Sequence, residues 1–212
     1  MGTIKQGILG GFSGKVGTVV GGSWKGISYM RSLPQSVKNP RTEGQVSQRT
    51  KFALVLGLLK PMTAFLRTGW KLYAHKQTPF NAAMSYTLAN AITGTYPDYS
   101  IDPSKVLVSR GSLATAANAS AVAAGGNIEI AWDDNSGVGS AKQTDKALIA
   151  VLNTAKGEAI TDTAGAERTE GAQTVVLPAD WLGDSVEVYL GFISEDKKEV
   201  ANSVYLGAVE VS

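Results

Sequence analysis

Cysteine is absent from this 212-residue chain, and histidine occurs once, as His75. Without thiols the chain forms neither disulfides nor thiolate metal sites. A single histidine excludes a multi-histidine metal site, and a Ser/His/Asp triad would have to use His75 in a chain that has no nucleophile-elbow motif. We therefore predict a non-enzymatic protein that uses no metal and no cofactor.

Long apolar runs are also lacking. No unbroken run approaches the about 18 apolar residues that a membrane span requires, so we expect no membrane span. Glycine interrupts every short apolar run before residue 26, which argues against a cleavable signal peptide. A cytoplasmic or virion-like location remains open, as does extracellular presence by non-classical export or lysis.

Acidic residues are scarce in the first half of the chain. Residues 1–100 contain twelve lysines or arginines against Glu43 and Asp98, a net charge of +10, whereas residues 101–212 carry −8. Such a dipolar chain fits a polyanionic partner, or the packing of one copy's basic half against another's acidic half. A third interpretation is simply two domains with different surfaces.

Glycine is abundant near the start, where residues 7–34 contain eight glycines among valines and aromatic residues. Two short strands, Lys15–Gly22 and Ile27–Ser32, are predicted to form a hairpin. The phosphate-binding spacing G-x-x-x-x-G-K-[ST] is not present in this segment. Because glycine loses much backbone entropy on ordering, this β arm needs a packing partner, either its own domain or a neighbouring copy.

Three helices are expected next, over residues 42–60, 61–75 and 78–94. Thr42 precedes Gln45 at the capping-box spacing, Pro61 suits the first turn of a new helix, and Thr78-Pro79 is a further start signal. Prolines and tyrosines over residues 96–103 indicate a linker. We therefore predict a basic domain over residues 1–101 and an acidic domain over residues 102–212.

From residue 105 the hydrophobic period changes from helical to β-type. Short β-type runs separated by turn residues occupy 105–109, 127–132, 146–153, 174–177, 185–193 and 203–211. The alanine-rich stretch 114–124 is either a loop or a strand of small residues. This pattern predicts an α+β chain whose C-terminal part is an antiparallel β-sandwich of immunoglobulin or fibronectin type. The acidic turn Asp133–Asn135 lacks the ligand spacing of a calcium loop, so we expect a solvated turn.

Four blocks carry a resemblance: GFSGKVGTVVGGSWKGISYMRSLP at 11–34, NPRTEGQVSQRTKF at 39–52, WDDNS at 132–136 and NSVYLG at 202–207. Together they resemble an uncharacterised family of Bacteroidota proteins of similar length, a domain of unknown function. The N-terminal block is also similar to short structural proteins encoded by phages. The resemblance implies a non-enzymatic protein of virion or prophage ancestry and transfers no catalytic residue.

The leading functional hypothesis is a structural protein that self-assembles into a filament, a lattice or a virion-like shell through its N-terminal β arm. Head-to-tail contacts between copies would use basic, aromatic and valine side chains, namely Lys15, Val19, Val20, Trp24, Lys25, Tyr29, Arg31, Arg41 and Arg49. One alternative is a surface or virion-associated adhesion module whose β-sandwich recognises glycan or protein, which exposed Trp132, Trp181 or nearby tyrosines in a groove would favour. Another, less favoured, is a packaging protein whose basic half binds nucleic acid.

Overall fold

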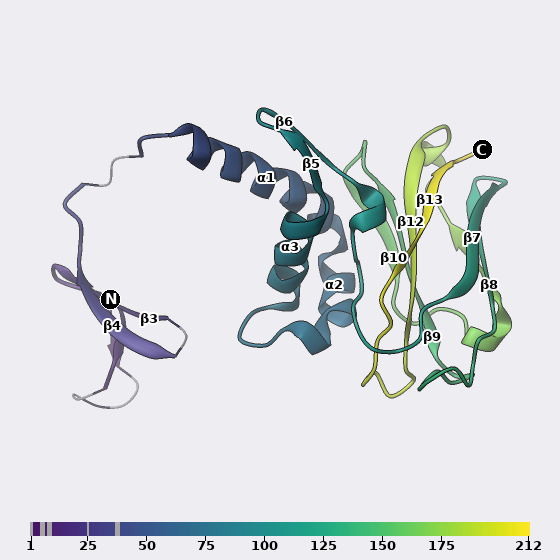
Figure 1. The fold of residues 1–212 in the computed structure, drawn as a ribbon, viewed down its shortest axis with the longest axis horizontal. Coiled ribbons are helices and arrows are strands. Elements are labelled where there is room, and N and C mark those ends of the chain that lie inside the picture. The colour runs from purple at the N-terminus through teal and green to yellow at the C-terminus, as the bar shows by residue number, and fades with distance from the viewer. Residues whose placement is uncertain (1, 5–6, 8–9, 25, 37–38) are drawn as a thin grey trace. The chain divides into compact units, whose positions relative to one another are not determined.

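The computed structural model describes residues 2–4, 7, 10–24, 26–36 and 39–212. They divide into two compact units, one within residues 1–42 and the other over residues 43–212 (Figure 1). The first unit is an antiparallel sheet, and the second combines helices with three further antiparallel sheets. The predicted α+β class is therefore confirmed. The predicted boundary between residues 101 and 102 falls inside the second unit.

The first unit is a four-stranded antiparallel sheet in the order β1-β2-β3-β4. Its strands are β1 (Thr3–Ile4), β2 (Phe12–Val16), β3 (Val19–Trp24) and β4 (Ile27–Ser32). Gly17 (φ +57°) and Gly26 (φ +85°) lie in the turns between β2 and β3 and between β3 and β4. These left-handed conformations are the ones that tight hairpin turns require. A hairpin is present, formed by β3 and β4 within a larger sheet. The strand predicted over Lys15–Gly22 is not a single strand, because a turn at residues 17 and 18 separates the end of β2 from β3, which continues to Trp24.

The second unit opens with one long helical segment. Helix α1 (Glu43–Leu59) begins directly after Thr42, where the sequence predicts the start. A 3₁₀ turn, η1 (Lys60–Met62), joins α1 to α2 (Thr63–Gly69), so Pro61 lies in a turn that continues the segment. After a second turn, η2 (Lys71–Tyr73), helix α3 (Pro79–Asn90) follows, and the Thr78 hydroxyl caps it by accepting from the Asn81 amide at 3.2 Å.

Two helix ends differ from the prediction. The helix expected to reach residue 75 ends at Gly69, where residues 108 and 109 pass close to the backbone. The helix expected to reach residue 94 ends at Asn90, and the next residues form strand β5 (Ile92–Thr95), paired with β6 (Asp98–Ile101). Gly94 adopts φ +82°, a conformation that a right-handed helix does not contain.

Two larger antiparallel sheets complete the second unit. One has the order β10-β9-β12-β13, and the other has the order β11-β8-β7. Their bounds are β7 (Ala117–Ala124), β8 (Asn127–Asp133), β9 (Lys146–Asn153), β10 (Glu158–Asp162), β11 (Ala172–Val176), β12 (Ser185–Ile193) and β13 (Val204–Glu210). A hydrophobic core that includes Trp132, Val151 and Leu190 lies between the two sheets.

The four-stranded sheet β10-β9-β12-β13 is buried on both faces. Along β9, Ile149 and Val151 enter the core shared with the three-stranded sheet, whereas Leu148 and Leu152 enter a second core with the helices. Successive strand residues point to opposite faces, so this requires the unbroken apolar run from residue 147 to 152. The second unit thus has three layers, helices, four-stranded sheet and three-stranded sheet (Figure 1).

Most predicted strands match the structure. Strands β9 and β12 have the predicted bounds, and the alanine-rich stretch is a strand, β7, rather than a loop. The strand predicted over 105–109 is not formed. Within this segment the Val108 amide donates to Ser203 Oγ at 2.9 Å, and the Ser109 carbonyl accepts from the Ser203 amide at 3.0 Å. The adjoining Arg110 amide donates to the Gly69 carbonyl at the end of α2 at 2.9 Å.

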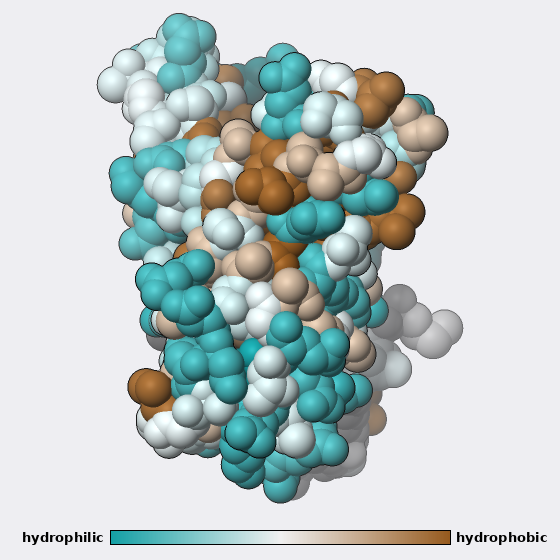
Figure 2. Space-filling view, turned by 90° about the vertical axis from the view of Figure 1, so that its right-hand side faces the viewer, coloured by the Kyte–Doolittle hydropathy of each residue, from teal (hydrophilic) through white to brown (hydrophobic). Residues whose placement is uncertain are grey.

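The outer face of the three-stranded sheet is solvated. Glu129, Ala131 and Asp133 of β8 are exposed, and they alternate with buried residues that face the core. Figure 2 shows this side of the molecule, where hydrophilic side chains cover the lower half and hydrophobic ones gather in the upper part. Glu129 and Asp133 share this outer face with the exposed side chains of Val122 and Val176, so the face is mixed in polarity.

A substitution at Gly69 tests the close approach at the end of α2. A Cβ at this position would lie 2.6 Å from the Val108 carbonyl oxygen and 2.9 Å from Ser109 Cβ. We expect Gly69→Ala to lower the free energy of unfolding by about 1–3 kcal/mol, the usual cost of overpacking. Gly57→Ala, in the middle of α1 with open space around it, is the matched control and should raise it by about 0.5–1 kcal/mol. Urea unfolding of both variants measures the difference, and equal effects would contradict the packing described here.

Candidate assembly interface

The N-terminal sheet is a single layer. Among its described residues only Gly21 is buried, and neither a helix nor a second sheet of the same unit covers either face. Large hydrophobic side chains are exposed instead: Trp24 is 63%, Ile27 67% and Met30 70% accessible. Stable domains ordinarily bury such a face against another layer. This sheet is therefore the part of the molecule most suited to an interface.

Strand register brings five of the predicted interface residues to one face, here called face A. Val20 lies opposite Lys15 of β2 on one side and Arg31 of β4 on the other. Because side chains alternate along strands, Trp24 and Tyr29 project from this same face. Ile27, paired with Trp24, extends its apolar part. Face A therefore comprises Lys15, Val20, Trp24, Ile27, Tyr29 and Arg31.

The other predicted interface residues lie elsewhere. Val19 pairs with Val16 and Ser32 and projects from the opposite face. Arg41 belongs to the segment before α1, and Arg49 is exposed on α1 in the second unit. Lys25 lies outside the described residues. The nine residues are thus not one surface, and the register selects five of them.

The glycines of this sheet make room for aromatic rings. On face A, a Cβ on Gly22 would lie 3.0 Å from Tyr29 Oη and 3.1 Å from Tyr29 Cζ, because the tyrosine lies across the glycine. On the opposite face, the Phe12 ring lies across Gly21 in the same way. Covering strand glycines with a neighbouring aromatic ring is a known means of stabilising a sheet. For Gly21 and Gly22, therefore, the absence of a side chain has a packing reason inside the unit.

Charge separates the two units sharply. Residues 1–42 contain six lysines or arginines and no acidic residue, whereas residues 43–212 contain fourteen basic and eighteen acidic residues. The sheet unit thus has no carboxylate of its own to pair with Lys15 or Arg31. An acidic surface would complement it, whether on protein or on a polyanion.

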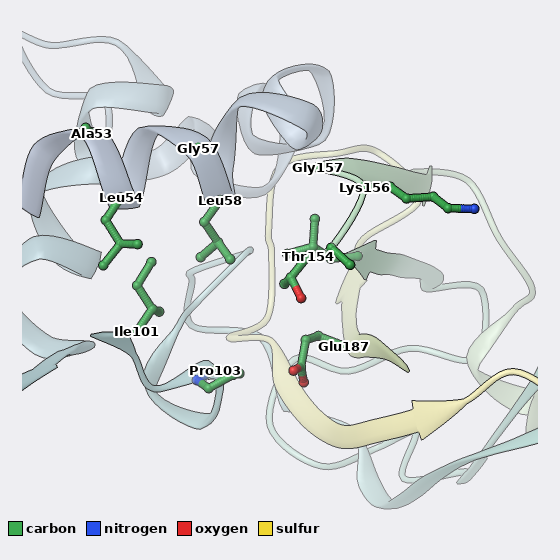
Figure 3. Close-up of a pocket in the computed structure, with 12 residues that line it drawn as sticks. Ala53, Leu54, Gly57, Leu58, Ile101, Pro103, Thr154, Lys156, Gly157 and Glu187 are labelled. Atoms are coloured by element: carbon green, nitrogen blue, oxygen red, sulfur yellow. The ribbon is translucent and has the colours of Figure 1, made fainter. Parts of the chain in front are cut away.

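A groove in the second unit lies between α1 and the turn that joins β9 to β10 (Figure 3). Its volume is about 640 Å³, and its apolar lining includes Leu54, Leu58, Ile101 and Pro103. On α1, residues 52–59 carry no charge; Val55 and Leu59 are buried, whereas Phe52 is 52% exposed. A helix that is hydrophobic all round is normally covered on every side.

The charged residues of the groove are Lys156 and Glu187. Lys156 Nζ lies 3.0 Å from Asp180 Oδ2 and 3.2 Å from Asp184 Oδ2, and Figure 3 shows its side chain extending away from the other lining residues. The hydrogen bonds from Asn153 and Lys156 lower the pKa of the Asp184 carboxyl. Glu187 Oε2 accepts a hydrogen bond from the Tyr205 hydroxyl at 2.5 Å. Lys156 and Glu187 line the groove, whereas Asp180 and Asp184 neutralise Lys156 beside it, so no unpaired lysine faces the groove among its lining residues.

Tyr189, whose hydroxyl is buried close to Glu187, gives a prediction at alkaline pH. Burial raises the pKa of the Tyr189 hydroxyl above its ordinary 10, and the Glu187 carboxylate adds to the effect. Above pH 10 the unfolded chain releases this proton while the folded chain retains it, so stability should fall as pH rises further. We expect Tyr189→Phe, which also loses the hydrogen bond to the Pro103 carbonyl, to cost about 1 kcal/mol at pH 7. The variant should show a shallower loss above pH 10, measured by urea unfolding between pH 7 and 11; parallel curves would contradict the assignment.

The second unit contains a buried ion pair that the sequence pattern does not indicate. Arg168 and Asp145 are both fully buried, with Arg168 Nε 3.2 Å from Asp145 Oδ2. The guanidinium also donates to the Asn135 side chain and to the Ala114 carbonyl, and it lies 3.8 Å from the centre of the Phe192 ring. Burial lowers the pKa of Arg168, and Asp145 opposes that shift. The partners of the guanidinium come from four separate segments of the chain, so Arg168 holds these segments together.

Other residues singled out in the sequence have local roles. Asp133 accepts from Asn118 Nδ2 at 2.6 Å, and Asn135 Nδ2 donates to the Thr115 carbonyl at 2.9 Å, so the acidic turn is held to its surroundings by hydrogen bonds. His75 is exposed in a turn after η2. Trp132 and Trp181, whose exposure would favour the adhesion alternative, are 4% and 1% accessible. Their burial counts against a binding groove built on these two side chains.

The helical segment Glu43–Gly69 is long and apolar enough, by length and composition, to cross a membrane. No such span is expected from the sequence, because charged and polar residues interrupt the apolar runs. In the structure, side chains along the segment pack into the first core, among them Val55, Leu59, Phe65 and Leu66. Core helices of other proteins satisfy the same length and composition criteria, so this property alone is weak evidence for a membrane span.

Comparison with protein-family models gives a match that covers most of the chain. No curated protein matches the chain. A family model described as a family of unknown function, DUF6266, matches residues 11–207, which include strands β2 to β4 and nearly all of the second unit. The match bears out the resemblance to an uncharacterised family. The chain belongs to the DUF6266 family of unknown function.

Proposed function

We propose that this protein is a non-enzymatic structural protein that self-assembles through its N-terminal sheet. One observation carries the proposal: a four-stranded sheet, to which the described residues of its unit add no second layer, exposes Trp24, Ile27 and Tyr29 on one face. Exposed apolar patches bordered by polar groups are typical of interaction sites. Aromatic residues and arginine are also the residue types that dominate interface energetics.

The charge distribution supports a second copy of the chain as the partner. The sheet unit is exclusively basic, and the second unit has an excess of acidic residues. Contact between the sheet of one copy and the second unit of the next is heterologous, because two different surfaces meet. Heterologous contacts form rings when the rotation closes and filaments when it does not. The resemblance of the N-terminal block to phage structural proteins is consistent with this role and remains a prediction.

Microscopy and light scattering of the purified full-length chain test the proposal. We expect filaments, sheets or rings in negative stain, and a scattering mass that grows with protein concentration. Because the contact joins opposite charges, raising the salt concentration from about 0.05 to 0.5 M should reduce the mass. A monomer at every concentration and salt condition would refute self-assembly.

A second candidate function is binding of single-stranded nucleic acid by face A. Lys15 and Arg31 lie on the same face as Trp24 and Tyr29, and basic groups combined with aromatic rings are the usual means of holding such strands. A filter-binding titration with single-stranded DNA and RNA tests it. Retention that falls steeply with salt would support this function, and no retention at low salt would dismiss it.

We also infer that the paired sheets of the second unit form a β-sandwich of fibronectin rather than immunoglobulin constant type. The constant-type arrangement puts four strands, ABED, on one sheet and three, CFG, on the other. Here the fourth strand of the seven, β10, pairs with the third, β9, which leaves three strands in the first sheet and four in the second. Such a module would form the body of each subunit, with the N-terminal sheet as the connector.

A further inference from the structure

We propose that the groove between α1 and the β9–β10 turn receives face A from a second copy of the chain. This inference rests on the proposed self-assembly and names its receiving surface. The groove has an apolar floor, formed by Leu54 and Leu58 of α1 together with Leu152 of β9. At about 640 Å³ it falls within the about 300–1,000 Å³ range of pockets that bury most of a small ligand, so it has room for more than one large side chain.

The occupant must be apolar and positively charged. The apolar lining calls for hydrophobic side chains. Its one lysine, Lys156, is already paired with Asp180 and Asp184, which leaves the Glu187 carboxylate as the lining charge that would attract a basic partner. Face A has both properties, because it presents Trp24, Ile27 and Tyr29 between Lys15 and Arg31 in a unit without acidic residues. The charge complementarity therefore favours a second copy of this chain over a neutral apolar ligand.

Helix α1 supplies an additional reason for a protein occupant. Ala53 and Gly57 lie one helical turn apart among the groove-lining residues, and they leave the helix backbone accessible at that point. A Cβ on Gly57 would meet nothing within 4 Å, so the space beside the helix is open. The aromatic side chains of face A could approach the helix backbone closely there, which a larger residue at position 53 or 57 would prevent.

Two matched glycine substitutions on α1 test the groove. Gly57→Leu fills the groove, and Gly44→Leu places the same side chain on the same helix outside it; both positions have open space around Cβ. Because leucine favours helices over glycine, neither variant should lose stability. By sedimentation velocity on the full chain, we expect Gly57→Leu to raise the dissociation constant of self-association at least tenfold, and Gly44→Leu to change it less than twofold.

The outcomes separate this inference from the function on which it rests. If Gly57→Leu assembles like wild type while Arg31→Glu does not, the groove is not the receptor, although self-assembly through face A stands. If wild type does not associate, both proposals fail. If Gly57→Leu abolishes sedimentation with anionic phospholipid vesicles and leaves self-association unchanged, the groove serves a membrane surface and the inference is wrong.

Engineered cysteines decide whether the two surfaces meet between copies or within one. Since the chain has no cysteine, Ile27→Cys and Ala53→Cys each carry a single thiol. Under mild oxidation of an equimolar mixture, we expect a mixed disulfide dimer in excess of either homodimer. A double variant, Ile27→Cys/Ala53→Cys, that cross-links as a monomer at every protein concentration would show contact within one chain and overturn the proposal.

Discussion

Arg31→Glu should dissociate the assemblies formed by the full-length chain. Arg31 is exposed on β4, opposite Val20 and in line with Lys15 on face A. Reversing its charge replaces an attraction to an acidic surface with a repulsion and places a carboxylate next to Tyr29 in the apolar part of the face. Interface residues of this kind contribute about 2 kcal/mol or more, so the dissociation constant should rise roughly thirtyfold, measured by sedimentation velocity at low salt.

The matched control for this prediction is Ser32→Glu. Ser32 is the next residue of β4 and also exposed, but it pairs with Val19 and projects from the opposite face. It introduces a negative charge on the same strand without touching face A. We expect Ser32→Glu to change the dissociation constant several-fold less than Arg31→Glu does. Ser32→Glu changes the net charge by one unit and Arg31→Glu by two, so a free-energy effect half as large as that of Arg31→Glu, or larger, would mean that net charge alone governs association and face A has no special role.

Asp145→Ala should be among the most destabilising single substitutions in the second unit. It leaves the fully buried Arg168 guanidinium without its carboxylate, and the Lys142 amide also loses an acceptor at 2.9 Å. Removing one partner of a buried pair typically costs about 3–5 kcal/mol, because the remaining charge stays uncompensated. Urea unfolding of the variant, followed by tryptophan fluorescence, measures the loss.

Two further variants make the buried pair a sharp test. The double variant Asp145→Leu/Arg168→Met removes both charges and should recover much of the lost stability, as apolar replacements of buried pairs often do. Lys105→Ala breaks the exposed pair between Lys105 and Asp102, joined at 3.0 Å, and should cost less than about 1 kcal/mol. A loss below about 1 kcal/mol for Asp145→Ala would show that Arg168 does not depend on its partner.

The sequence predicted the elements whose patterns depend on local residues. Strand β9 is recognisable because residues 147–152 are continuously apolar, and β12 because its alternation is clear. The start of α1 follows from Thr42, and the N-terminal hairpin from glycines at its turns. In these elements local propensity and tertiary structure agree, so reasoning from residue type was sufficient.

The remaining features depend on contacts between distant residues. Strand β10 has few strand-favouring residues and is held by its pairing with β9. The segment 105–109 has a strand-like pattern, yet the Val108 amide and the Ser109 carbonyl form hydrogen bonds with Ser203, more than ninety positions away. Arg168 and Asp145 are 23 positions apart, and neither is distinguishable in the sequence from a surface charge.

The candidate interface was predicted by residue type and refined by register. Basic and aromatic residues at 15–31 indicated an interaction surface, but type alone does not say which side of a strand a residue occupies. Register places Lys15, Val20 and Arg31 in one row across the sheet and turns Val19 to the other side. The groove beside α1 was not predicted, because its walls come from a helix, a hairpin turn and a strand that are far apart in the chain.

Sedimentation velocity of the wild-type chain over a hundredfold range of concentration, at low and high salt, is the decisive test of self-assembly. We expect species larger than the monomer that grow with concentration at low salt and dissociate at high salt. A single monomeric boundary at every concentration and both salt conditions would contradict it.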